Sequence, residues 1–155
     1  MIVIKQIIIL VFWILIFKTS YSQCNNSGSV DWNNLQQKTG NSDWDTQISY
    51  ATYNLKAFFG TDADVFYSDS EELNAFALKK KDNFSRHKVC ITKGMLKFLS
   101  VDQSKYWPIN LSIILSHEWG HLLQYDFEIY FSIPKHYELL SDCMSSFMFS
   151  IEMSA

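Results

Sequence analysis

The stretch IILSHEWGHLLQ, residues 113–124, places two histidines and a glutamate inside a run that is otherwise largely apolar. The flanking isoleucines and leucines predict a buried helix, in which an ionisable group without a partner is energetically costly. His117 and His121 stand four residues apart, so at about 100° per residue they share one face of that helix. Both imidazoles can therefore reach a single ion, and the His-Glu-x-x-His pattern predicts a metal site.

Zinc is the metal that suits this pattern. Two neutral imidazole nitrogens, a third protein ligand and an open fourth position make a Lewis-acidic catalytic site. Water on such an ion has a pKa of about 7. Glu118 lies beside the ligand face, where it can accept a proton from that water, so we expect it to be the general base. The alternative is a structural His/Glu cluster, held by hydrogen bonds alone, in a surface interaction protein.

The third ligand defines the subclass of metalloprotein. A metzincin would carry Gly and His at positions 124 and 127, where this chain has Gln124 and Phe127, so that class is excluded. In a second predicted helix, Glu138 and Asp142 stand four apart on one face. A Glu followed one turn later by an Asp is the arrangement of glutamate-zincins, with Glu138 as a ligand and Asp142 holding the outward ring nitrogen of a ligand histidine. His136 is a rival ligand if it precedes the helix.

The patterns on either side of these helices predict an α+β domain. A helix is predicted to open at Asp43 and to end at Gly60, followed by three strand patterns and a short helix start. We expect a small antiparallel sheet, packed on the two site helices, with the charged connector 79–87 projecting from it. The strand patterns, the short helix and the two site helices lie at residues 63–69, 72–78, 88–92, 93–100, 108–126 and from 135 toward the end.

The first 22 residues have the pattern of a signal peptide. The apolar run from Ile7 to Phe17 is well short of the roughly 20 residues that span a bilayer. A small-x-small site predicts cleavage before Gln23, so we expect an exported protein, periplasmic or secreted. The alternative is an uncleaved amino-terminal anchor, which is the only membrane association that the sequence indicates. Residues 23–42 are expected to be an extended lead-in.

Charge and cysteine content exclude other classes of function. The formal net charge is −3 and no basic stripe is present, so nucleic acid is excluded as a partner. Three cysteines, Cys24, Cys90 and Cys143, allow at most one disulfide. They show no Cys-x-x-Cys spacing, and we expect them to be small buried hydrophobic residues.

Four segments, in order, resemble the HtpX-like and CAAX-prenyl-protease-like zinc metallopeptidases, in particular their soluble exported members. VFYSDSEELNAFAL (65–78) resembles that family's strand, turn and Asn-Ala-Phe-Ala strand, and VCITKGML (89–96) resembles its next strand and helix start. LSHEWGHLL (115–123) matches its zinc helix, and ELLSDCMSSF (138–147) resembles its Glu-x-x-x-Asp helix. The order and rough spacing agree over about residues 63 to 150.

The resemblance implies a zincin-like fold and a zinc endopeptidase, with one zinc per chain, that cuts unfolded or misassembled exported proteins. The strand that contains Asn74, Ala75, Phe76 and Ala77 would line the cleft and pair its backbone with an extended substrate. We therefore expect residues 43–155 to form a zinc metallopeptidase domain.

The chain departs from the family pattern in three places. Lys79–Lys81 replace the usual Pro-Gly-Gly, and the segment 101–110 lacks the usual acidic entry to the zinc helix. The chain stops at Ala155, where family members continue with helices that supply an oxyanion-stabilising His, Arg or Tyr. A non-catalytic, truncated protein that binds zinc or unfolded chains without cutting them is therefore the alternative. The candidates for the oxyanion role in this chain are Tyr130, Tyr137 and His136.

Overall fold

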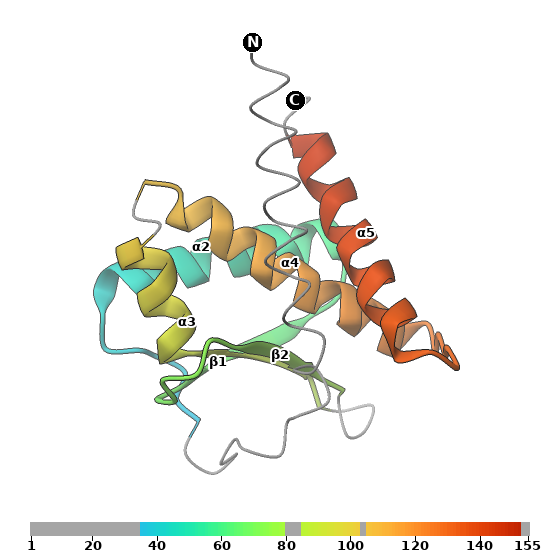
Figure 1. The fold of residues 1–155 in the computed structure, drawn as a ribbon, viewed down its shortest axis with the longest axis horizontal. Helices are drawn as coiled ribbons and strands as arrows, with labels where there is room; N and C mark the ends of the chain where they lie inside the picture. Colours follow the sequence, from blue (N-terminus) through green and yellow to red (C-terminus); the bar gives the residue numbers. More distant parts are fainter. Residues whose placement is uncertain (1–34, 80–84, 103–104, 153–155) are drawn as a thin grey trace.

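The computed structural model describes residues 35–79, 85–102 and 105–152, which form helices packed on a small sheet (Figure 1). The predicted signal peptide, most of the predicted lead-in, Cys24 and two of the three connector lysines lie outside the described residues. The described elements are α2 (Ser42–Phe59), β1 (Ala63–Ser68), β2 (Ala75–Leu78), β3 (His87–Thr92), α3 (Lys93–Lys97), the π-helical turn η3 (Phe98–Asp102), α4 (Trp107–Asp126) and α5 (Pro134–Glu152).

Helix α2 begins one residue earlier than the sequence predicts. Asn41 is its N-cap, and the side chain of Asn41 accepts hydrogen bonds from the backbone N–H groups of Asp43 and Trp44. Asn41, Ser42 and Asp43 are all good capping residues, so composition alone does not distinguish among them. The predicted end is confirmed, because Gly60 adopts a left-handed conformation with φ of 67° and its N–H bonds to the Lys56 carbonyl.

The α+β class is confirmed, and the sheet is mixed. Its strand order is β1-β3-β2, with β2 antiparallel to β3 as expected and β1 parallel to β3. The expectation of a wholly antiparallel sheet is therefore wrong for β1. The short connector between β2 and β3 identifies those two as neighbours, whereas the partner of β1 depends on where the loop after Ser68 crosses. That loop carries the chain past the central position, so β2 becomes an edge strand.

Gly94 and Thr92 fix the loop that precedes β2. A Cβ atom on Gly94 would lie 2.2 Å from the Glu71 carbonyl oxygen, so the loop rests directly on this glycine. The Thr92 hydroxyl lies 2.6 Å from the Glu72 carbonyl oxygen and 2.8 Å from that of Asn74. It also accepts a hydrogen bond from the Asn74 N–H. These contacts fix the position along β3 at which β2 begins.

The core lies between one face of the sheet and helix α4. Figure 1 shows α4 running across the sheet, with α5 against its C-terminal part. Trp119 of α4 is fully buried, and its indole N–H donates to the Thr61 carbonyl. No helix among the described residues is both long and apolar enough to span a membrane. The main core residues from the sheet and the helices are Leu55, Ala63, Val89, Ile91, Leu111, Leu115 and Leu122.

Candidate metal centre

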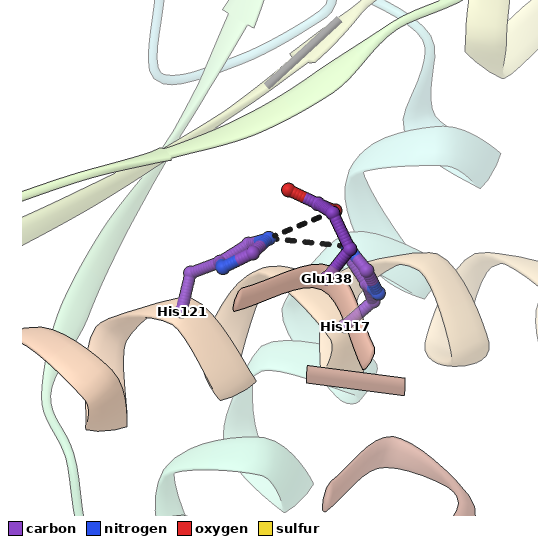
Figure 2. Close-up of side chains that lie close together, drawn as sticks. All are labelled: His117, His121 and Glu138. Atoms are coloured by element: carbon purple, nitrogen blue, oxygen red, sulfur yellow. Dashed lines mark hydrogen bonds and ion pairs between the residues drawn. The ribbon is translucent and has the colours of Figure 1, made fainter. Parts of the chain in front are cut away.

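Two side chains from α4 and one from α5 meet at one point (Figure 2). His117 and His121 extend from successive turns of α4, and Glu138 extends from α5. The Nε2 atoms of the two histidines are 3.2 Å apart. The Glu138 Oε2 atom lies 3.2 Å from His117 Nε2 and 3.5 Å from His121 Nε2. The three side chains named as ligands from the sequence are thus brought together, pointing toward one another.

The triangle of these three atoms has the size of one face of a zinc coordination sphere. Zinc–nitrogen and zinc–oxygen bonds are about 2.0–2.1 Å long, so ligand atoms at tetrahedral corners stand roughly 3.3–3.4 Å apart. The observed edges of 3.2, 3.2 and 3.5 Å agree with that separation. Two imidazoles and one carboxylate are also the donor set of catalytic zinc sites that keep one position open. The residues present therefore fit a single zinc ion.

Asp142 orients His117. Its Oδ1 atom lies 2.9 Å from His117 Nδ1. An ionised carboxylate only accepts hydrogen bonds, so this contact favours a proton on Nδ1 and leaves the Nε2 lone pair directed toward Glu138. The side chain of Asp142 is 52% exposed, which places this contact at the rim of the site. Asp142 thus occupies the place that the Glu-x-x-x-Asp spacing predicts.

His121 is held by two residues, Gln124 and Ser141, for which the sequence predicted no role in the metal site. Its Nδ1 atom lies 3.0 Å from the Ser141 hydroxyl and 3.3 Å from the Gln124 Oε1 atom. Gln124 and Ser141 are both buried. A polar residue three positions after His121, within the buried run of α4, is the signal that could have identified Gln124. Ser141 has no such signal, because serine is common on helices that face a neighbour.

Gly120 allows α4 and α5 to approach closely enough for these contacts. A Cβ atom on Gly120 would lie 2.9 Å from the Ser141 Cα and 3.0 Å from its hydroxyl oxygen. One turn earlier on α4, Ser116 hydrogen-bonds to Ser145 of α5. A small residue of α4 therefore lies in the helix contact directly before each ligand histidine, and this brings Glu138 within reach of them.

Glu118 is buried beside the cluster. Only 3% of its surface is exposed, and its Oε2 atom has no hydrogen-bond partner among the described residues. Burial raises the pKa of Glu118, and the nearby imidazoles of His117 and His121 only partly oppose this effect. A hydrogen bond from the backbone N–H of Ala77 also favours the carboxylate form. A buried carboxyl with an unsatisfied oxygen and a raised pKa is suited to accept and return a proton.

The pKa of Glu138 is shifted in the opposite direction to that of Glu118. Burial would raise its pKa, but the close approach of the His117 and His121 rings outweighs this and holds the pKa of Glu138 well below its usual range. The two glutamates of the site therefore differ. Glu138 stays ionised and can act as a ligand, whereas Glu118 is poised for proton transfer.

Among the described residues, strand β2 lies at the edge of the sheet, and its outer side is next to Glu118. The Thr92 N–H bonds to the Asn74 carbonyl, which makes Asn74 and, two residues on, Phe76 the positions that pair with β3. Ala75 and Ala77 therefore direct their backbone N–H and C=O groups away from β3. The Ala77 N–H is the group that reaches Glu118. Of the four residues named as a substrate-binding strand, Ala75, Phe76 and Ala77 thus lie in the edge strand β2, and Asn74 directly precedes it.

The remaining candidates lie elsewhere. His136 is inside α5, two residues before Glu138 and so on another face of the helix, and its ring packs on Phe131 at a centroid distance of 5.7 Å. The Tyr137 hydroxyl accepts a hydrogen bond from the Phe131 N–H, and Tyr130 is largely exposed in the preceding loop.

The two cysteines in the described part of the chain are both free thiols. Cys90 is buried in β3, and Cys143 is exposed on α5. The expectation that each cysteine is a small buried residue therefore holds for Cys90 and is wrong for Cys143.

Comparison with known proteins gives one finding about family. The sequence model of the family described as Peptidase family M48 matches residues 45–150, which is more than half of the chain. This match covers most of α2, the sheet, all of α4 and nearly all of α5. It confirms the resemblance to HtpX-like and CAAX-prenyl-protease-like proteins. No curated protein and no solved structure matches the chain.

Proposed function

Because the chain belongs to peptidase family M48, a family of zinc-dependent metallopeptidases, we propose that it is a zinc endopeptidase that cuts unfolded or misassembled exported proteins. The observation that carries the proposal is the triangle of His117 Nε2, His121 Nε2 and Glu138 Oε2, with edges of 3.2 to 3.5 Å. These residues would hold one zinc ion per chain. Bound zinc supplies a Lewis acid that polarises a carbonyl group and lowers the pKa of water toward neutrality.

Glu118 performs the proton transfers of hydrolysis. Its carboxylate accepts a proton from the attacking water while the water oxygen bonds to the carbonyl carbon of the scissile peptide. The carbon–nitrogen bond then breaks, and Glu118 gives the proton to the leaving amine nitrogen. The raised pKa of Glu118 supports both steps, because the protonated form is stable enough to exist between them.

The free edge of β2 binds the substrate as an added strand. Ala75 offers its N–H and C=O groups and Ala77 offers its C=O group, since the Ala77 N–H is engaged by Glu118. Only a polypeptide segment that is not already paired in a fold can align along this edge, which favours unfolded or misassembled chains as substrates. The signal-peptide pattern of residues 1–22 favours exported proteins, periplasmic or secreted, as the pool of substrates.

A substitution of Glu118 tests the proposal. With a reduced and alkylated fluorescent protein as substrate, the zinc-loaded wild type should produce internal fragments. Glu118→Gln should retain zinc and lose at least about 100-fold in rate, the lower end of what general base catalysis contributes. The natively folded form of the same substrate is the control and should be cut far more slowly. A zinc-loaded wild type that binds the unfolded substrate without cutting it would instead establish the non-catalytic alternative.

A further inference from the structure

A chain of buried hydrogen bonds connects the backbone of α5 to the ring of His121. Gln124 is 1% exposed and Ser141 is fully buried, so water does not compete for their polar atoms. The Gln124 Nε2 atom donates to the Tyr137 carbonyl oxygen at 2.8 Å and to the Ser141 hydroxyl at 2.8 Å. The other end of the amide, Oε1, lies 3.3 Å from His121 Nδ1.

The Tyr137 carbonyl determines which way the Gln124 amide points. A carbonyl oxygen only accepts hydrogen bonds, so the amide nitrogen of Gln124 must face it. A reversed amide would set two oxygen atoms against each other at the 2.8 Å distance of this contact. The amide oxygen of Gln124 is therefore fixed on the side of His121.

The fixed amide in turn favours a proton on the ring nitrogen of His121 that faces it. The Gln124 oxygen can only accept, so the facing Nδ1 atom satisfies it by donating an N–H. The Nε2 atom is then left with its lone pair and points to the centre of the cluster. His117 reaches the same arrangement by a different device, the Asp142 carboxylate at 2.9 Å.

We propose that Gln124 is a positioning residue. Its amide is oriented by the hydrogen bond to the Tyr137 carbonyl, and this orientation makes Nε2 the metal-binding atom of His121. This inference rests on the proposed zinc site. Tyr137 immediately precedes Glu138, so the same turn of α5 delivers both the third ligand and the carbonyl that orients the second. The metal site is consequently assembled as a unit when α5 docks on α4, and the Ser141 hydroxyl, which accepts from Gln124, also lies 3.0 Å from His121 Nδ1.

The proposal is tested with Gln124→Met in the full chain, a change that keeps the length of the side chain and removes its amide. The zinc dissociation constant, measured by competition with a chelator, should rise about 10- to 100-fold, as is usual when the partner of a ligand histidine is removed. In the zinc-loaded wild type, ¹⁵N-histidine NMR should show a slowly exchanging Nδ1–H on His121. In Gln124→Met that proton should exchange rapidly. The signal of His117 should be unchanged.

Ser145→Ala is the matched control. Ser145 is buried in the same contact between α4 and α5, where it hydrogen-bonds to the Ser116 hydroxyl and the Ile113 carbonyl. A general loosening of the helix contact would weaken zinc binding in both variants. Loss of the hydrogen-bond chain from the Tyr137 carbonyl through Gln124 to His121, here called the relay, affects Gln124→Met alone.

The possible outcomes separate this inference from the proposed function. A folded Gln124→Met variant that binds zinc as tightly as the wild type, with His121 Nδ1–H still protected, would overturn the relay and leave the peptidase proposal standing. Zinc bound through Nδ1 of His121 in the wild type would also overturn it, and this test needs no variant. A wild type that binds no zinc would remove the proposed function and the relay together.

Discussion

Gly120 of α4 lies so close to Ser141 of α5 that a Cβ atom at position 120 would stand 2.9 Å from the Ser141 Cα. The second variable position of the His-Glu-x-x-His pattern is thus part of a helix contact. Because Ser141 touches the His121 ring and Glu138 lies one turn before it, the spacing of the two helices sets the size of the metal cluster.

Gly120→Ala should therefore weaken both the fold and the zinc site. Alanine in a helix gains about 1 kcal/mol over glycine, but overpacking against a backbone atom costs about 1–3 kcal/mol, so the overpacking should prevail. Urea unfolding should show a lower free energy of unfolding, and chelator competition should show weaker zinc binding. Ser146→Ala, an exposed change on α5, is the control. Unchanged zinc affinity in a folded Gly120→Ala protein would refute this account of the helix contact.

Gly94→Ala should separate substrate binding from metal binding. A Cβ atom at this position would lie 2.2 Å from the Glu71 carbonyl oxygen and must displace the loop that sets β2. The ligands lie on α4 and α5, so zinc content should stay near that of the wild type. Cleavage of an unfolded substrate should fall, mainly through a higher KM, because the free edge of β2 shifts. Equal loss of zinc and activity would mean that the sheet edge and the metal site are not independent.

Asp126→Ala should destabilise the fold without affecting zinc. The carboxylate of Asp126 lies 2.8 Å from His87 Nε2 and accepts a hydrogen bond from the Thr61 hydroxyl at 3.2 Å. The side chain of His87 is 2% exposed. Removing the carboxylate leaves buried polar groups without this partner, which costs about 1–3 kcal/mol. Denaturant unfolding should show this loss, while zinc titration of the folded protein should match the wild type. A variant of wild-type stability would show that water or another group replaces the contact.

Thiol modification should distinguish the two described cysteines. Burial, with a contribution from Glu118, raises the pKa of Cys90 to about 12. The thiolate is the reactive form, so Cys90 should stay protonated and unreactive toward iodoacetamide at pH 8. Cys143 is exposed and should be alkylated in the native protein. Peptide mass spectrometry should find Cys90 labelled only after unfolding. Rapid labelling of Cys90 in the native state would contradict the burial of β3.

Local patterns predicted the parts of the site that depend on helix geometry. The spacing of His117 and His121, and that of Glu138 and Asp142, places each pair on one face of its helix whatever the surroundings. The relay through Gln124 and Ser141 could not be predicted in this way. It depends on which residues of α4 face α5, and that is decided by the crossing of the two helices.

The sheet shows the same division between local and long-range information. The bounds of β1 and β3 and the cap at Gly60 follow from short patterns of residue types, and they are confirmed to within one residue. Strand β2 is shorter than its pattern predicts, because it begins at Ala75 and not at residue 72. The parallel pairing of β1 with β3 was not predicted, because it depends on the path of the loop over Gly94. A glycine that accommodates a neighbouring backbone is indistinguishable, in one sequence, from a glycine that ends a turn.

Metal content, measured by inductively coupled plasma mass spectrometry on the purified full chain, tests the central claim most directly. The account predicts about one zinc per wild-type chain, lost in Glu138→Ala and retained in His136→Ala, since His136 lies on another face of α5. A folded wild type without zinc would contradict the account. So would a Glu138→Ala variant that keeps its zinc, because the triangle of two imidazoles and one carboxylate would then not be the metal site.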